Sequence, residues 1–283
     1  MNRRNILLIA GAVIGIGVLA VLAGLSLTHF NPKSVMPTSR VIEQAYPIDG
    51  TVVGLDVQTL SGDVELVLVH DGAARVESRH SENVAETFEV KNGVLTLKQK
   101  SSGKSILNFG EDIQDGVTLY LTEDAYSSLN VATASGDVKV SEALSFEKAA
   151  LATASGDVSF AAKCGELSAA TASGDVLLRG VLAERINLAT ASGEVEMENT
   201  SATEKLSVET VSGDVKLSSC DAAELELHST SGDIEGTLLT PKDFDVKTVS
   251  GKIEVPAGVS GAGRCIIETV SGDVELRVAG GVI

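Results

Sequence analysis

Residues 129–140 read LNVATASGDVKV, and residues 186–197 repeat the pattern as INLATASGEVEM. A Ser-Gly pair followed by Asp, Glu or Lys and then by Val or Ile occurs nine times in the chain. The copies begin at Ser61, Ser135, Ser155, Ser173, Ser192, Ser212, Ser231, Ser250 and Ser271. From Ser135 onward they are spaced 18 to 21 residues apart, which indicates a repeat architecture.

Apolar residues alternate with polar ones on both sides of each Ser-Gly pair, as Leu129 and Val131 do before Ser135 and Val138 does after it. This period of two, interrupted by a turn, predicts two short strands per repeat, each with one buried face. Within the turn, we expect the Gly to adopt a backbone conformation that is closed to other residues. Because one repeat cannot bury its own apolar face, the copies must stack on one another. The sequence therefore predicts an all-β fold, a β-solenoid with coils of about 19 residues.

The chain divides into a regular part at 126–283 and an irregular N-terminal β region at 51–125, which shares the motif at Ser61. In the irregular region we expect strands at 88–90, 94–97 and 117–121, a turn at Asn92-Gly93 and an insertion loop at 101–116.

The first fifty residues differ in composition from the rest. Residues 6–27 are 22 consecutive uncharged residues, and Arg3 and Arg4 precede them. About 20 apolar residues in a helix cross a bilayer core, and the positive-inside rule keeps the two Arg residues in the cytoplasm. We therefore predict a cytoplasmic tail at 1–4, a transmembrane signal anchor at 5–28 and a stalk at 29–50. The protein would be a single-pass protein of the cell membrane with its repeats outside; a cleavable signal peptide is the alternative.

The Gly-Asp-Val turn, the alternating strands and the run at 117–121 leading into Leu129-Asn130-Val131 resemble the bacterial "putative adhesin" family of β-strand-repeat domains. The resemblance covers residues 50–283 and implies an envelope protein with a binding or scaffolding role. It also implies an N-terminal membrane segment in some members and an association with envelope-stress signalling in others. The family offers no catalytic residues to carry over. Glu194 and Lys252 depart from the Asp of the motif.

Composition and charge exclude several functions. The net charge of −17 argues against nucleic-acid binding, which needs a basic surface to neutralise phosphates. The four His residues, His29, His70, His80 and His228, lie far apart in the sequence, and no catalytic motif accompanies them. The three Cys residues, Cys164, Cys220 and Cys265, fall in different repeats and are expected to be free thiols. We therefore predict that the chain is not an enzyme and needs no organic cofactor.

Two polar columns accompany the repeat. A Thr, or Ser229 in one copy, stands two residues before each repeat Ser, in phase with the buried positions. We expect these hydroxyls to form hydrogen bonds inside the turn. The acidic column contains Asp137, Asp157, Asp175, Asp214, Asp233 and Asp273. Such a ladder of carboxylates could bind Ca²⁺, and the alternative is that each Asp caps its turn while facing water.

A third column is apolar and faces outward. It contains Ala132, Ala152, Ala170 and Ala189, with Ala134, Ala154, Ala172 and Ala191 beside it, and we call these eight residues the Ala strip. In later copies the first column becomes Glu209, His228, Lys247 and Glu268. Exposed apolar strips usually mark a contact, so we expect residues 67–125 or a partner to cover this one.

Three roles fit these observations. The first is a membrane-anchored binding or scaffold module of the bacterial cell envelope, with a protein or cell-wall glycan as its partner. The second is a component of an envelope-stress signalling system. The third is a structural protein that associates with itself end to end.

Overall fold

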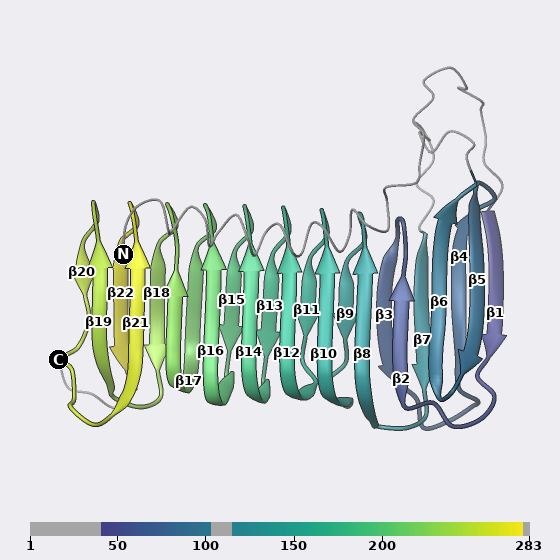
Figure 1. Ribbon diagram of the computed structural model, residues 1–283, viewed down its shortest axis with the longest axis horizontal. Helices are drawn as coiled ribbons and strands as arrows, with labels where there is room; N and C mark the ends of the chain where they lie inside the picture. Colours follow the sequence, from purple (N-terminus) through teal and green to yellow (C-terminus); the bar gives the residue numbers. More distant parts are fainter. Residues whose placement is uncertain (1–40, 103–114, 280–283) are drawn as a thin grey trace, which may run out of the picture.

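A computed structural model of the chain describes residues 41–102 and 115–279. The regular structure of these residues is entirely β-strand, arranged as a long flattened solenoid (Figure 1). The prediction of an all-β solenoid is confirmed. Over the described ranges, no helix is long and apolar enough to cross a membrane. The predicted tail at 1–4, the anchor at 5–28 and most of the insertion loop at 101–116 lie outside the described residues.

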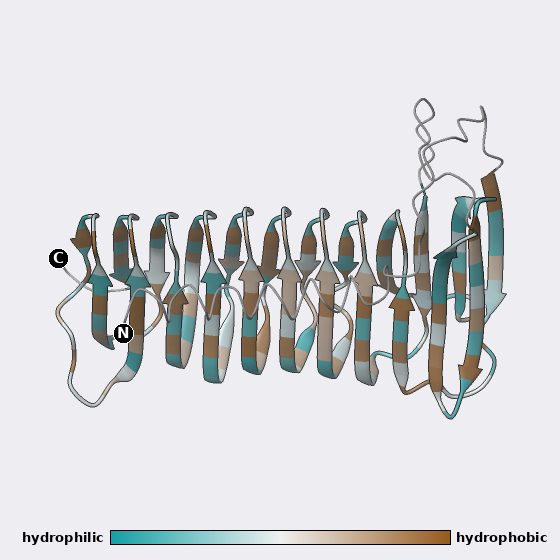
Figure 2. Cartoon of the chain, turned by 45° about the horizontal axis from the view of Figure 1, so that its top comes forward, coloured by the Kyte–Doolittle hydropathy of each residue, from teal (hydrophilic) through white to brown (hydrophobic). Residues whose placement is uncertain are grey.

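The strands form two sheets that enclose one apolar core, and each coil contributes a strand to each sheet (Figures 1 and 2). In spatial order, sheet B contains β5 (Val84–Lys91), β6 (Val94–Ser101), β2 (Gly54–Gln58), β8 (Ala125–Thr133), β10 (Ser145–Thr153), β12 (Lys163–Thr171), β14 (Leu182–Thr190), β16 (Ser201–Thr210), the end of β17 (Val215–His228), β21 (Gly263–Thr269) and β19 (Lys242–Thr248). Sheet A contains β1 (Val41–Pro47), β4 (Arg75–Ser81), β7 (Gly116–Leu121), β3 (Asp63–Leu68), β9 (Val138–Val140), β11 (Val158–Phe160), β13 (Val176–Arg179), β15 (Val195–Glu198), the start of β17, β18 (Ile234–Leu238), β22 (Val274–Val278) and β20 (Ile253–Glu254).

The columns read from the sequence are the core of the solenoid. The β-branched residue that follows each turn is buried in every coil except the last, where Ile253 is exposed. Val158 and Val176, both at 0% exposure, pair in register on parallel strands. The residues beside them, such as Ser159, lie on the outer face of the sheet. The apolar side chains of each coil are therefore buried between its two strands and against the coils on either side of it, as expected of a solenoid.

In the middle of the rod, the Thr of the turn joins two coils. The Thr171 hydroxyl accepts a hydrogen bond from the backbone N–H of Gly174 at 3.0 Å and donates one to the carbonyl oxygen of Gly156 in the preceding coil, also at 3.0 Å. Thr153 and Thr190 make the same pair of bonds. The prediction that these buried hydroxyls form hydrogen bonds inside the turn is confirmed for six coils, from Thr133 to Ser229. It is wrong for Thr59, Thr248 and Thr269, whose buried hydroxyls have no hydrogen-bond partner among the described residues.

The Gly of each turn is required for a reason other than the one we expected. Among the nine motif glycines, Gly62 has a positive φ, of 85°, and the others do not. A Cβ at Gly156 would overlap the carbonyl oxygen of Gly136, and a Cβ at Gly174 would overlap that of Gly156. The Gly therefore permits the turns of adjacent coils to approach closely, and this close approach fixes the residue type.

At the N-terminal end, three antiparallel strands close the stack. The strand β5 pairs with β6 through the Asn92-Gly93 turn, whose two residues both have positive φ, and β4 and β1 extend sheet A. The Tyr46 ring of β1 stacks on the Phe88 ring of β5, with 4.5 Å between ring centroids. The expected strands at 88–90, 94–97 and 117–121 are therefore confirmed. The stalk expected at 29–50 is wrong for its last part, because Val41–Pro47 form β1.

At the C-terminal end, the coils do not stack in chain order. The strand β21 lies between β17 and β19, and β22 lies between β18 and β20. The chain thus passes one coil position at Lys242–Glu254 and then returns to fill the gap with Gly263–Val278 (Figure 1). The terminal coil of the solenoid is β19 with β20.

A buried Lys stabilises this order. Lys242 is 2% exposed, and its Nζ forms an ion pair with Asp221 and donates a hydrogen bond to the carbonyl oxygen of Ala222 at 2.6 Å. These partners belong to β17, two coils away, so the side chain must pass the intervening strand. Gly263 lies opposite Lys242 there, and a Cβ at Gly263 would be 3.0 Å from Nζ. The absence of a side chain at Gly263 gives Lys242 its path.

We expect Gly156→Ala to lower the free energy of unfolding by about 3 kcal/mol, because the added Cβ forces adjacent turns apart. Thermal unfolding followed by circular dichroism would measure the loss. The matched control is Gly258→Ala, since a Cβ at Gly258 meets its nearest atoms at 3.5 Å, an ordinary contact. Equal stability of the two variants would contradict the close-approach argument.

We expect Thr171→Val to cost about 1–3 kcal/mol, because the buried N–H of Gly174 and carbonyl of Gly156 lose their partner while the side-chain volume is kept. Thr171→Ser retains the hydroxyl and should recover most of this loss. Denaturant unfolding of the two variants would test the difference, and a Val variant as stable as the Ser variant would refute it.

Candidate functional site

The Ala strip lies on the outer face of sheet B, at the end of the strands next to the turns. Ala132, Ala152, Ala170 and Ala189 pair directly with one another on four consecutive coils. Their side chains are half-buried, apart from Ala189, which is buried. The second set, Ala134, Ala154, Ala172 and Ala191, lies in the adjoining turns and is half-buried. The structure therefore brings the eight residues together as one strip.

A second column of small side chains lies beside the strip, and the sequence analysis missed it. Asn130, Ala150, Ser168, Asn187 and Ser207 pair in register on the four coils of the strip and the coil after them, and all face outward. The signal was present in the aligned repeats, five positions before the repeat Ser. Together the two columns make a flat face of short side chains across the middle of the rod, which we call the flat face.

A ladder of ion pairs borders the flat face on the side away from the turns. Glu166 accepts from Lys148 at 2.9 Å and also pairs with Arg185, which in turn pairs with Glu204. The hydrogen bonds from Lys148 and Arg185 hold the pKa of Glu166 below its ordinary value. Because these groups are exposed, their charges neutralise one another with little effect on stability.

Toward the C-terminal end the same outer column becomes charged. Glu209, His228 and Glu268 pair in register, and Lys247 pairs with Glu268 in the terminal coil. The Glu268 carboxylate lies 3.4 Å from Lys247 Nζ and 3.9 Å from His228 Nδ1. Partial burial raises the pKa of Glu209 above its ordinary value. This end of sheet B therefore presents alternating charges where the middle presents Ala.

Residues 67–125 do not cover the strip in the described part of that region. The strands β4, β5, β6 and β7 instead extend the two sheets at the N-terminal end. The expectation that residues 67–125 would lie over the Ala strip is wrong for these strands, because their own edges pair with the stack.

The acidic column runs along the turns and is exposed or half-buried. Each carboxylate accepts the backbone N–H of the equivalent residue in the next coil, as Asp157 Oδ1 does from Asp175 at 2.8 Å. The column continues through Asp137, Asp214, Asp233 and Asp273, and Asp273 accepts the N–H of Lys252 in the terminal coil. Glu194, one methylene longer, pairs instead with Lys216 at 2.7 Å. One oxygen of each Asp is thus engaged in the turn, and in the described part of the chain no group of three or more His, Cys, Asp or Glu residues could hold a metal ion.

A buried polar cluster at the N-terminal end was not anticipated. The Glu86 carboxylate is 2% exposed and accepts hydrogen bonds from Ser78 at 2.5 Å, Gln99 at 2.8 Å and Tyr46 at 3.0 Å. His80 Nε2 lies 3.7 Å from the same carboxylate. Burial, together with the Glu86 charge, raises the pKa of Tyr46 to about 12. The donors come from β1, β4 and β6, so this cluster ties the closing strands to one another.

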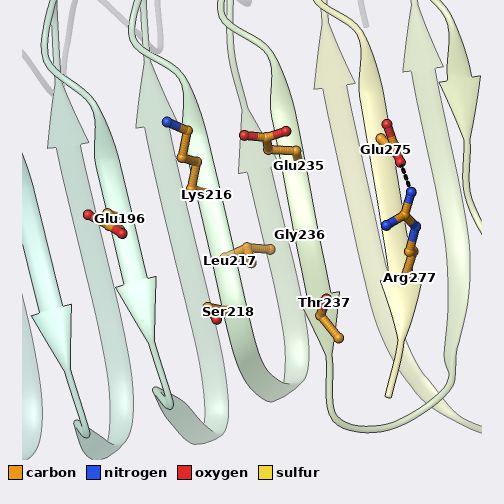
Figure 3. A pocket seen from close by; sticks show the side chains of 9 residues that line it. All are labelled: Glu196, Lys216, Leu217, Ser218, Glu235, Gly236, Thr237, Glu275 and Arg277. Atoms are coloured by element: carbon orange, nitrogen blue, oxygen red, sulfur yellow. Dashed lines mark hydrogen bonds and ion pairs between the residues drawn. The ribbon is translucent and has the colours of Figure 1, made fainter. Parts of the chain in front are cut away.

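The outer face of sheet A has a shallow open depression of about 290 Å³. It lies over Gly236, which occupies the position where other coils carry Leu178, Met197 or Leu276 (Figure 3). Glu196, Lys216 and Glu235 surround it, and Glu275 pairs with Arg277 beside it. The charged side chains there are exposed to solvent, so the depression provides no desolvated group for chemistry.

The three Cys residues are free and buried. Burial raises the pKa of Cys164 to about 11 and that of Cys265 to about 12, so neither thiol is a ready nucleophile. Of the His residues within the described ranges, His80 lies in the polar cluster, His228 on sheet B and His70 in an exposed bend. The structure does not bring them together.

These stacked strands and turns match one family. The family model described as Toastrack DUF4097 matches residues 55–204 and 184–281. The chain belongs to this family. No curated protein matches it.

Several solved structures have the same fold. A "putative adhesin" from Parabacteroides distasonis ATCC 8503 is 16% identical, with 84% of this chain and 98% of that chain covered and a TM-score of 0.53. A "putative lipid binding protein" from the same strain is 19% identical, with coverage of 84% and 96% and a TM-score of 0.53. A "putative adhesin" from Parabacteroides merdae ATCC 43184 is 13% identical, with coverage of 86% and 98% and a TM-score of 0.53. At these identities the likeness shows the fold alone.

We expect Ca²⁺ to leave the melting temperature of the protein unchanged, because one oxygen of each Asp already accepts a backbone N–H and a single remaining oxygen per coil is far fewer than the six to eight ligands that Ca²⁺ takes. Differential scanning fluorimetry with added Ca²⁺ and with a chelator would measure this. A saturable rise in melting temperature that disappears in Asp157→Asn/Asp175→Asn would show that the acidic column binds the cation.

Proposed function

We propose that the chain is a membrane-anchored, extracytoplasmic binding module of the bacterial cell envelope that uses the flat face to contact a protein or cell-wall glycan. The observation that carries this proposal is the register of Ala132, Ala152, Ala170 and Ala189 on four consecutive coils. Such a surface lets a partner approach the sheet closely, because no long side chain stands between them. The ladder around Glu166 and Arg185 supplies polar groups at its border, as binding surfaces usually have.

The N-terminal sequence supports the membrane anchor and the outward orientation. The uncharged residues 6–27 follow Arg3 and Arg4 and precede β1 in the chain. Because the chain enters the solenoid through β1, this end would lie nearest the membrane and the terminal coil of β19 and β20 farthest from it.

Binding is better supported than catalysis. Polar side chains that the repeat supplies are occupied in holding coils together, as Thr171 and Asp157 are. The adhesin names of structures with this fold point in the same direction. End-to-end polymerisation is less well supported, because one end of the rod is closed by antiparallel strands and the other is not.

We expect Ala152→Glu/Ala170→Lys to abolish partner capture without lowering the melting temperature, because both side chains point outward from sheet B and the two new charges, which lie opposite each other, have opposite signs. The measurement is crosslinking of the full-length protein in its native membrane, followed by mass spectrometry of the captured partners. Ser159→Glu, on the outer face of sheet A, is the matched control and should capture as the wild type does.

The identity of a partner lost only in the double variant distinguishes the roles. Wall glycan or a surface protein would support the adhesin-like role, and a membrane sensor kinase or its regulator would support the envelope-stress role. Capture that is equal in the wild type, the double variant and the control would refute the flat face as the binding surface.

A further inference from the structure

The terminal coil leaves the core of the solenoid open to solvent. Ile253 is 43% exposed, whereas the equivalent residues Ile234 and Val274 of the two preceding coils are 0% and 1% exposed. Phe244 and Val246 on β19 are only half-buried, although their side chains point inward against the core. Burial of such residues in every other coil depends on the next coil, and within the described residues no next coil is present.

The same coil presents an unpaired strand edge. Among the described strands, β19 pairs with β21 alone. The N–H of Ser229, in the coil before β21, donates to the carbonyl oxygen of Glu268 on β21 and so points toward the next coil. The equivalent residue of β19 is Thr248, whose N–H therefore also points toward the next coil position, away from β21. Backbone groups alternate in direction along a strand, so Val246 and Phe244 face the same open side. The loop after β20 covers this edge only at its start, where Val259 N–H donates to the Lys242 carbonyl at 2.9 Å.

The two ends of the rod differ in how their edge strands are protected from pairing with another strand. At the N-terminal end, Tyr46 stacks on Phe88 across the core and Pro47 ends β1. Native proteins use such antiparallel closure, Pro and charge to prevent strand addition. The terminal coil has a short β20 of two residues, and β19 exposes its edge from Phe244 to Thr248. The strands β1 and β5 at the N-terminal end are also edge strands, since each pairs with one described strand. Because the Tyr46–Phe88 stack covers the core there, strand addition buries more apolar surface at the C-terminal end.

The side chains of β19 are complementary to an antiparallel copy of themselves. Suppose that two β19 strands from two copies pair antiparallel with Val246 at the centre. On the inner face, Val246 of one copy then lies opposite Val246 of the other, and Phe244 lies opposite Thr248. On the outer face, Asp245 of each copy lies opposite Lys247 of the other, which gives two ion pairs. Opposite charges on facing strands stabilise the pairing. Val246 and Phe244 point their backbone groups at the partner in this register, as an antiparallel ladder requires. Pairing about Asp245 would instead place two carboxylates opposite each other.

We propose that a second copy of this chain docks on the terminal coil, with the two β19 strands pairing antiparallel about Val246. The result is a closed, tail-to-tail pair of rods with a continuous sheet B and a continuous core. Because the contact is isologous, it stops at two copies and does not form a filament.

The test is the dissociation constant of the full-length protein in mild detergent, measured by analytical ultracentrifugation over a concentration series. Asp245→Lys places Lys opposite Lys247 in both pairs, and we expect it to weaken the dimer about tenfold or more. Asp245→Lys/Lys247→Asp restores opposite charges and should return the dissociation constant to near the wild-type value. Lys139→Glu, an exposed charge reversal on β9, is the control and should leave it unchanged.

A second measurement tests the register. Val246→Cys should form a disulfide-linked dimer on mild oxidation, since the native Cys residues are buried. A monomeric wild type, or a dimer that Asp245→Lys and Lys139→Glu weaken equally, would overturn the proposal. A dimer formed through residues 6–27 would respond equally to Asp245→Lys and Lys139→Glu, so the experiment distinguishes it from pairing of the β19 strands.

One consequence rests on the proposed function. If the N-terminal end is anchored in a membrane, tail-to-tail pairing joins rods from two facing membranes. Vesicles carrying the full-length protein should then cluster. Asp245→Lys should reduce the clustering, and Asp245→Lys/Lys247→Asp should restore it. Dimers in detergent without vesicle clustering would overturn the facing-membrane arrangement and leave the strand pairing intact.

Discussion

The close approach of consecutive turns is the constraint on which the rest of the solenoid depends. A turn can lie against the next only if its Gly has no side chain, because the Cβ would occupy the space of a carbonyl oxygen in the preceding coil, as at Gly156 and Gly136. The Thr hydroxyl then satisfies groups in both turns, and the Asp carboxylate accepts an N–H from the next coil. Three short residues, Gly, Thr and Asp, thus hold the turns of adjacent coils together beside a core with few aromatic side chains. With the turns held at a fixed spacing, the Val and Leu columns are brought into contact in register.

The same constraint explains the shape of the outer faces. A fixed coil spacing aligns equivalent residues in straight columns, so a preference for Ala at one position becomes a strip across four coils. A preference for alternating charge becomes a ladder, as between Lys148, Glu166 and Arg185. The rod is therefore a scaffold whose inner columns are fixed by packing and whose outer columns are free to carry recognition. The binding role we propose uses the columns that the fold does not need.

The ends of the rod are built differently from its middle, and there the repeat rules no longer hold. The N-terminal end uses antiparallel strands and a buried carboxylate, Glu86, with donors from three strands. The C-terminal end uses an out-of-order coil that Lys242 fixes to Asp221. Each device compensates for the missing neighbour, but only the first closes the core. The open terminal coil is for this reason the place where the structure points to a second copy.

The repeat by itself determined the two-strand coil, the buried columns, the Thr hydrogen bonds and the placement of the Ala strip. These features depend on contacts between equivalent residues of adjacent coils, and an alignment of the repeats places equivalent residues together. Tertiary structure alone decided that β21 lies between β17 and β19, that Val41–Pro47 form a strand and that Gly156 serves close approach. The reason is that the repeat motif specifies which faces of two coils pair. Because every coil carries the same motif, the motif does not specify which coil lies next to which. The order of coils is chosen by single residues outside the motif: Lys242, whose partners lie two coils away in space, and Gly263, which lies between them.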